Sequence, residues 1–243
     1  MDLAPLVPEL VTLHVWGVPT RRIPQSVAAM ARDRRPVAQA PGHTFHKLLG
    51  TGDGRTFTVR DADPRHWALL VCWSDARAAE GFERSPVVRR WDARAAVADG
   101  GERLRVAMTP LASRGWWDDR QPFGEPEPRR YDGPVASLTR ARLRPRLTPT
   151  FWRAVPPVSA RAQQSPGLIT TLGIGEAPLG RQGTFSLWES PGAIDAFAYG
   201  SPEHRAVIEQ TRTVGWYSQE LFARFAVVEA RGSFGGRRID IVT

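Results

Sequence analysis

The histidine best suited to ligate a metal lies in the segment SPEHRAVI, residues 201–208. Ser201 and Pro202 are typical of a helix N-terminus, which places His204 in the first turn, on the apolar face. The positive end of the helix dipole disfavours an imidazolium, so we expect a neutral imidazole, which can ligate iron if it faces a cavity. A core histidine bonded to backbone is the alternative interpretation.

A second Ser-Pro segment in the chain argues for the functional interpretation. The segment SPVVRRW, residues 85–91, starts in the same way but carries Val88 where the first segment carries His204. The first copy of this element therefore has an apolar residue at the position that His204 occupies in the second copy. This difference predicts a site in the second half of the chain alone.

The remaining histidines and the single cysteine are weaker candidates. His43 and His46 are three residues apart on an expected strand, so we expect them to point to opposite faces. His14 falls on the more polar face of the first strand and His66 in a loop, and all four are interpreted as structural or surface residues. Cys72 aligns with a leucine of the second half, which favours a small core residue over a thiolate ligand.

Aromatic residues gather in the second half. Trp73 and Trp188 occupy matching positions in two similar segments, so we expect both in the core. Trp152, Trp216 and Phe222 cluster in the second half and suit the wall of an aromatic pocket, although such aromatic residues more often belong simply to the core.

The chain contains an internal duplication. Similar segments follow one another in the same order in both halves, first at an offset of 125 residues and then at 115, so the first copy carries an insertion near residues 55–66. The anchors are Leu13 and Leu138, Pro41 and Pro166, Trp73 and Trp188, and Ser85 and Ser201.

Each copy predicts strand, helix, two strands, helix and strand, which is the ferredoxin-like arrangement. The expected ranges are 11–16, 24–34, 43–50, 67–73, 75–96 and 103–110 in the first copy, and 135–142, 148–162, 168–175, 181–188, 190–213 and 222–228 in the second. We therefore predict an α+β fold in which two tandem ferredoxin-like repeats pack as an intrachain dimeric α+β barrel enclosing a small-molecule cavity.

The domain boundaries follow from composition. Residues 1–117 form the first half, and 118–134, rich in Pro, Gly and charge, form a linker. Residues 135–231 form the second half with the site. The Gly- and Arg-rich tail 232–243 is expected to be poorly ordered.

Composition restricts the partners and the compartment. The 243-residue chain has a net charge of +8, but its basic residues are spread along the sequence without a zinc-finger or aromatic RNA-binding pattern, so we expect no nucleic-acid partner. A basic face would still attract an acidic protein or an anionic membrane surface. A single cysteine, the absence of a signal-peptide pattern and the absence of long apolar runs predict a cytoplasmic protein without transmembrane segments.

Several longer motifs resemble the spheroidene monooxygenase family of carotenoid biosynthesis. They are FHKLLGTGDGRTFT, MTPLASRGWW, LTRARLRP, FWRAVP, GIGEAPLGRQGTFSLW and PEHRAVIEQTRTVGWYSQELFARF. The resemblance extends from about residue 10 to 228, and the last motif is the most specific. The first strand, LHVWGVP, departs from the family pattern, which leaves the substrate open.

The resemblance implies a haem-dependent oxygenase that uses dioxygen, or peroxide, and electrons from a ferredoxin-type donor. It implies the barrel shared with chlorite dismutases and aldoxime dehydratases, with His204 as the proximal iron ligand. Arg140 and Lys47 match basic positions of the family, and we expect them to bind the haem propionates, or Arg140 to donate a proton to bound oxygen. A solvated strand residue is the alternative interpretation. An aldoxime dehydratase-type enzyme, a cofactor-free monooxygenase of the antibiotic-biosynthesis type and a non-catalytic haem-binding protein stay open, as does a homo-oligomer.

Overall fold

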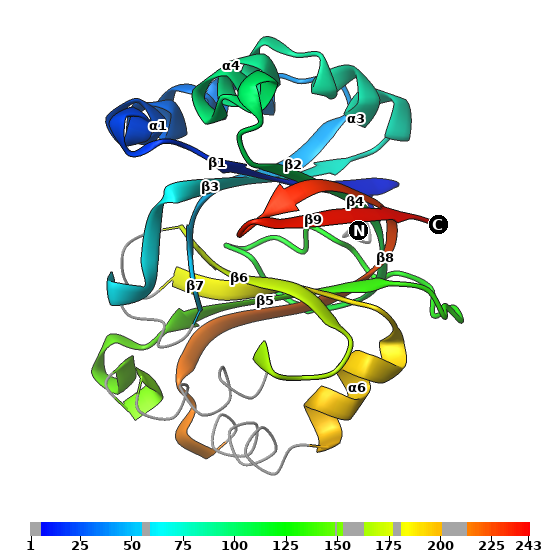
Figure 1. The fold of residues 1–243 in the computed structure, drawn as a ribbon. Coiled ribbons are helices and arrows are strands. Elements are labelled where there is room, and N and C mark those ends of the chain that lie inside the picture. Colours follow the sequence, from blue (N-terminus) through cyan, green and yellow to red (C-terminus); the bar gives the residue numbers. More distant parts are fainter. Residues whose placement is uncertain (1–5, 55–58, 149, 153–162, 177–180, 201–212) are drawn as a thin grey trace.

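The computed structural model describes residues 6–54, 59–148, 150–152, 163–176, 181–200 and 213–243. Within these ranges the predicted α+β class is confirmed. Nine antiparallel strands form one continuous sheet, and helices cover its outer faces at opposite ends of the molecule (Figure 1).

In the first half the strand order is β4-β1-β3-β2, and four helices cover the outer face of these strands (Figure 1). The strands are β1 (Leu10–Gly17), β2 (His43–Gly52), β3 (Ala62–Trp73) and β4 (Arg103–Gly115). The helices are α1 (Ile23–Arg32), α2 (Arg34–Ala38), α3 (Ala76–Glu83) and α4 (Pro86–Ala95), with short 3-10 turns at Thr20–Arg22, Val59–Asp61 and Val97–Asp99. The expected cap of α4 is confirmed, because the hydroxyl of Ser85 accepts the backbone N–H of Val88 at 3.3 Å.

In the second half the order β8-β5-β7-β6 repeats that of the first half, as the duplication predicts. The described elements are β5 (Val135–Leu143), a 3-10 turn at Pro145–Leu147, β6 (Leu168–Gly175), β7 (Arg181–Trp188), α6 (Pro191–Gly200) and β8 (Tyr217–Phe234). Helix α6 lies on the outer face of these strands (Figure 1).

The two halves join edge to edge and close an eight-stranded barrel. Strand β2 pairs with β6 at one seam, and β4 pairs with β8 at the other. Alternate side chains of all eight strands fill the interior with one apolar core, which includes Leu13, Leu138 and Phe185. Cys72 belongs to this core, as expected, and burial raises the pKa of its thiol, so it is an inert apolar residue.

Separate apolar clusters fill the space between the barrel and its helices. Trp73 lies in the cluster of the first half and Trp188 in that of the second, and both are almost fully buried. Their expected place in the core is confirmed.

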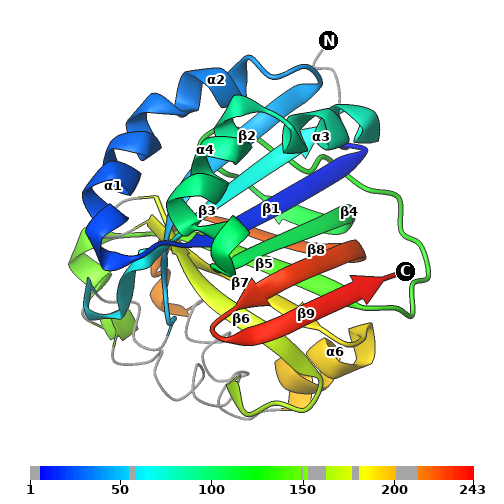
Figure 2. The same cartoon turned by 45° about the horizontal axis from the view of Figure 1, so that its top comes forward.

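The prediction that the tail, residues 232–243, is poorly ordered is wrong. Residues Arg237–Val242 form β9, which pairs with the end of β8 (Figure 2). Gly235 and Gly236 have φ angles of 61° and 74°, the left-handed conformation that a two-residue hairpin turn needs. The glycines that suggested a loose tail therefore form the turn of a hairpin.

One histidine prediction is also wrong. A bulge at Thr44 interrupts the alternation of β2, so His43 and His46 lie on the same side, with Nε2 and Nδ1 2.8 Å apart. His14 lies on the more polar face of β1, as expected, and α3 and α4 cover that face and bury the side chain completely. Burial, above all, lowers the pKa of His14 to about 4, so its imidazole is neutral.

Candidate functional site

The outer faces of the two half-sheets are built on the same register but carry different side chains. In the first half β1 pairs with β3 as β5 pairs with β7 in the second, so each opposed pair has an equivalent. The pairs are His14–Leu69, Thr12–Val71 and Trp16–Trp67 in the first half, and Thr139–Thr184, Ser137–Ser186 and Ala141–Gln182 in the second. Large side chains of the first half are thus replaced by small, mostly hydroxylated ones.

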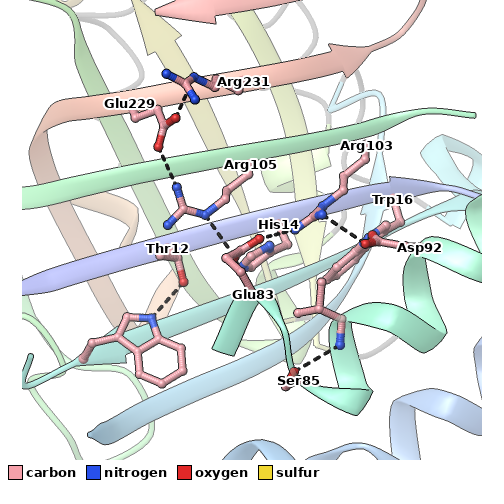
Figure 3. A network of polar contacts seen from close by, with 12 residues as sticks. Thr12, His14, Trp16, Glu83, Ser85, Asp92, Arg103, Arg105, Glu229 and Arg231 are labelled. Carbon is pink, nitrogen blue, oxygen red and sulfur yellow. Dashed lines mark hydrogen bonds and ion pairs between the residues drawn. The ribbon is translucent and has the colours of Figure 1, made fainter. Parts of the chain in front are cut away.

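The outer face of the first half is filled. Trp16 stacks on Trp91 of α4 with ring centroids 5.4 Å apart, and His14 stacks on Trp16 at 5.2 Å. The indole N–H of Trp16 donates to Asp92 at 2.7 Å (Figure 3). The helices therefore rest directly on this face, and no ligand fits between them and the sheet.

An ion-pair network closes the same face. Arg105 Nε donates to Glu83 Oε1 at 3.0 Å, Arg103 also pairs with Glu83, and a second nitrogen of Arg103 donates to Asp92 at 3.0 Å (Figure 3). Burial alone would raise the pKa of the Glu83 carboxyl, but His14 and the two arginines together hold it below its usual value. Glu83 is therefore a stable anion that ties α3 to β4.

The outer face of the second half is open by comparison. Thr139, Thr184 and Ser186 are only half-buried, whereas Leu138 and Leu187, which point into the barrel from the same strands, are fully buried. The side chains on this face are mostly smaller than their equivalents in the first half, and we call this face of β5 and β7 the recess. We take this recess as the candidate functional site.

A pair of hydroxyl groups lies at the centre of the recess. Thr139 Oγ1 and Thr184 Oγ1 are 2.6 Å apart across β5 and β7. One hydroxyl donates to the other, so the accepting hydroxyl keeps a proton of its own to donate. Beside them, the buried amide nitrogen of Gln182 has no hydrogen-bond partner among the described residues. The recess thus contains hydrogen-bond donors, namely one hydroxyl of the threonine pair and the amide of Gln182.

The end of β2 and the residues directly after it reach across to the recess. A Cβ atom added at Gly173 of β6 would lie 3.2 Å from the oxygen of Gly52 and from the nitrogen of Gly54. A Cβ added at Gly54 would lie 3.9 Å from the methyl carbon of Thr184. Gly52 and Gly54 of the first half therefore form part of one wall of the site in the second half.

The predicted aromatic residues lie around this face. Phe222 of β8 is paired with Thr139 and is half-buried. Trp152 and Trp216 form an apolar cluster with Phe151 at the end of β5, and the indole nitrogen of Trp152 is buried without a hydrogen-bond partner among the described residues. The structure brings the two tryptophans together and places Phe222 on the neighbouring strand.

Arg140 and Lys47 are brought together, but inside the barrel. Arg140 alternates with Thr139 on β5, so its side chain, 2% exposed, points away from the recess. Its Nε donates to Glu176 Oε1 at 3.0 Å, and Lys47 Nζ donates to Glu176 Oε2 at 2.9 Å. Asp118 accepts from both cations, and Gln219 from Arg140.

The charges of this interior network balance, because the two cations, Arg140 and Lys47, are paired with the two carboxylates of Glu176 and Asp118. The indole N–H of Trp117 also donates to Glu176, at 2.8 Å. Burial raises the pKa of Asp118, but Lys47 and Arg140 together bring it below its usual value. The role of Arg140 and Lys47 toward a cofactor stays a prediction, and their geometry gives them a second role in joining the halves.

His204 lies outside the described residues, so its position stays a prediction. Among the described residues no three His, Cys, Asp or Glu side chains are grouped to hold a metal ion. Likewise, no helix in the described part of the chain is long and apolar enough to cross a membrane.

Sequence reasoning missed the hydroxyl pair, since serine and threonine are ordinary strand residues and only the comparison with the first half singles them out.

Solved structures with a similar fold are known. Two solved aldoxime dehydratase structures superpose with TM-scores of 0.60, at 14% and 13% identity, and cover 92% and 90% of the chain. One of them is a complex with butyraldoxime. At this identity the likeness concerns the barrel fold alone. No family model matches the sequence.

Curated sequences give a closer relationship. The spheroidene monooxygenase of Rhodobacter capsulatus is 36% identical over 224 residues, which cover 90% of the chain and 89% of that protein. The enzyme of the same name from Rubrivivax gelatinosus is 36% identical over 84% of the chain, and that from Cereibacter sphaeroides is 31% identical over 81%. Identity at this level over nearly the whole length means that the chain belongs to the spheroidene monooxygenase family.

Proposed function

We propose that this protein is a haem-dependent monooxygenase that oxidises a carotenoid, with the haem over the recess of the second half. The observation that carries the proposal is the replacement of large residues by small ones at equivalent positions of two otherwise similar half-sheets. A flat macrocycle needs such a face, and the names of the relatives supply the reaction class and the substrate class.

The described residues fit a haem group. The recess combines small side chains with the unpaired amide of Gln182, and Phe222 and Trp152 offer aromatic surface at its edges. His204 would ligate the iron from the helix that the Ser-Pro start predicts. When bound, haem iron supplies the site at which dioxygen or peroxide is activated.

The residues of the chain have separate tasks in this proposal. The Thr139–Thr184 pair presents a hydroxyl proton on the sheet side of the recess, where it can donate to a polar ligand. The aromatic wall excludes water and accepts an apolar polyene. Since no recognisable flavin or nicotinamide loop is present in the sequence, electrons come from a separate, ferredoxin-type protein.

The absorption spectrum of the protein titrated with haem tests the proposal. We expect one haem per chain for the unmodified protein and for His43→Ala, a control histidine outside the recess. His204→Ala is expected to lose stoichiometric binding and its Soret band while remaining folded, because the equivalent position, Val88, needs no polar group. An unchanged Soret spectrum in His204→Ala would refute the ligand assignment.

Oxygen consumption then separates the alternatives. A haem-loaded protein that consumes dioxygen with a carotenoid and a reduced ferredoxin is a monooxygenase. A colourless, iron-free protein that still oxidises the substrate would instead be a cofactor-free enzyme, and haem binding without turnover would mean a haem-binding protein.

A further inference from the structure

Arginine side chains converge on a single carboxylate at the junction of α1, α2 and α4, far from the recess. Figure 2 shows these three helices side by side over the first half-sheet. Asp33, which links α1 to α2, is completely buried. Arg32 donates to it twice, at 2.9 and 3.0 Å, and Arg90 of α4 donates to it at 3.0 Å.

A third arginine lies at this carboxylate without bonding to it. Arg94 of α4 is about nine-tenths buried, and its nearest guanidinium nitrogen is 4.0 Å from Asp33 Oδ2, beyond hydrogen-bonding distance. Its Nη1 is buried and has no hydrogen-bond partner among the described residues. The guanidinium instead packs over the ring of Trp91, 4.7 Å from the centroid.

The charges in this cluster do not balance. Three guanidinium groups surround one carboxylate, so two positive charges remain uncompensated, and Arg22 adds repulsion from the start of α1. Burial in the first place, then Arg32, lowers the pKa of Arg94. Buried cations are normally paired, since an unpaired one carries a large desolvation cost. The arrangement is therefore that of a cation cluster that lacks an anion.

We propose that Arg32, Arg90 and Arg94 form a binding site for a phosphate-type oxyanion. Guanidinium groups match the geometry of phosphate oxygens and bind them through paired hydrogen bonds. Arg32 and Arg90 are half-exposed and lie at the entrance, while Arg94 contributes charge from below. The shared chemistry is a phosphate group, either free or on an anionic lipid headgroup. This inference does not depend on the proposed function.

Thermal unfolding in inorganic phosphate, compared with chloride at equal ionic strength, tests the site. We expect the midpoint to rise by roughly 3 °C at ten times the dissociation constant and to keep rising with the logarithm of the phosphate concentration. Arg94→Met keeps a long apolar stem over Trp91 and is expected to abolish the response without lowering the midpoint in chloride. Arg90→Gln serves as a second cluster variant in case Arg94→Met does not fold. Arg89→Gln, an exposed neighbour on α4, is the matched control and should respond like the unmodified protein.

Sedimentation with vesicles separates the two sources of phosphate. Binding to phosphatidylglycerol vesicles but not to phosphatidylcholine vesicles, lost in Arg94→Met or Arg90→Gln, would identify a lipid headgroup. A rise of the midpoint in phosphate beyond that in chloride, without vesicle binding, would identify a free anion. The proposal is overturned if phosphate acts no differently from chloride and vesicles do not bind, or if the cluster variants behave like Arg89→Gln.

Discussion

At the scale of single residues, burial decides the chemistry of each titratable group more than its type does. His14 is an example, because its strand places it on the more polar face and the helices above that face bury it completely. His14 packs between Trp16 and Phe82 with neither ring nitrogen hydrogen-bonded, so it serves as an aromatic core residue. The sequence shows its type and its strand, but its burial comes from helices that pack on it from elsewhere in the chain.

His14 makes stability depend on pH. Its pKa is about 4 in the folded protein against 6.5 in the unfolded chain, because burial disfavours the imidazolium. Between these values the unfolded chain binds the proton and the folded chain does not. The free energy of unfolding therefore falls as pH decreases from 6.5 to 4, by about 3 kcal/mol, and is independent of His14 above pH 6.5.

Urea denaturation at pH 7.5 and 4.5 measures this effect. His14→Leu removes the titrating group and keeps an apolar side chain, so its loss of stability between the two pH values should be smaller by roughly 2–3 kcal/mol. His46, whose pKa is also about 4, titrates in both proteins and cancels in the comparison. Equal losses in the two proteins would show that His14 is not responsible.

At the scale of the elements, alternation and the duplication predicted the strands well and the loops poorly. The eight barrel strands follow from period-two patterns, and β6 and β7 begin and end as expected. The bulge at Thr44 was not predictable, because register against β3 creates it and no local residue signals it. β9 was missed because a Gly-Gly turn and a flexible tail have the same composition. Predicting the recess requires two kinds of information, the internal repeat and the register in which the strands pair. The sequence alone shows the repeat but not the register.

Filling the recess with the residues of the first half tests its role as a ligand site. Thr184→Leu with Ser186→Val copies Leu69 and Val71 onto β7. We expect haem affinity, measured by absorption titration, to fall by roughly tenfold or more, which is about 1.4 kcal/mol. The thermal midpoint should not fall, since the same side chains are stable on the equivalent sheet.

A matched control uses the same two positions with nearly constant volume. Thr184→Ser with Ser186→Thr keeps both hydroxyl groups and should retain haem affinity. If both double variants bind haem as the unmodified protein does, the ligand site lies elsewhere.

At the scale of the whole molecule, two seams of unequal strength hold the halves together. Strand β4 pairs with β8 from Leu104 to Gly115, whereas β2 pairs with β6 only from Gly50 to Gly52. Lys47 belongs to β2, and Glu176 directly follows β6, so their ion pair lies beside the short seam. Through Glu176 and Asp118 the same network reaches Arg140 of β5. We infer that these ion pairs stabilise the barrel where the pairing of β2 with β6 is short.

Removing the charge of Glu176 should therefore destabilise the barrel at the shorter seam. Glu176→Gln leaves Arg140 and Lys47 in a buried site with one carboxylate instead of two, and loss of one partner in such a site costs about 3–5 kcal/mol. Asp240→Asn is the control, because its partner Arg238 is 87% exposed and such pairs contribute about 0–1 kcal/mol. Urea denaturation should show one cooperative transition at a clearly lower midpoint for Glu176→Gln and an almost unchanged one for Asp240→Asn. Since the halves share one barrel core, separate transitions for the two halves, or equal midpoints in both variants, would contradict this account of how the barrel closes.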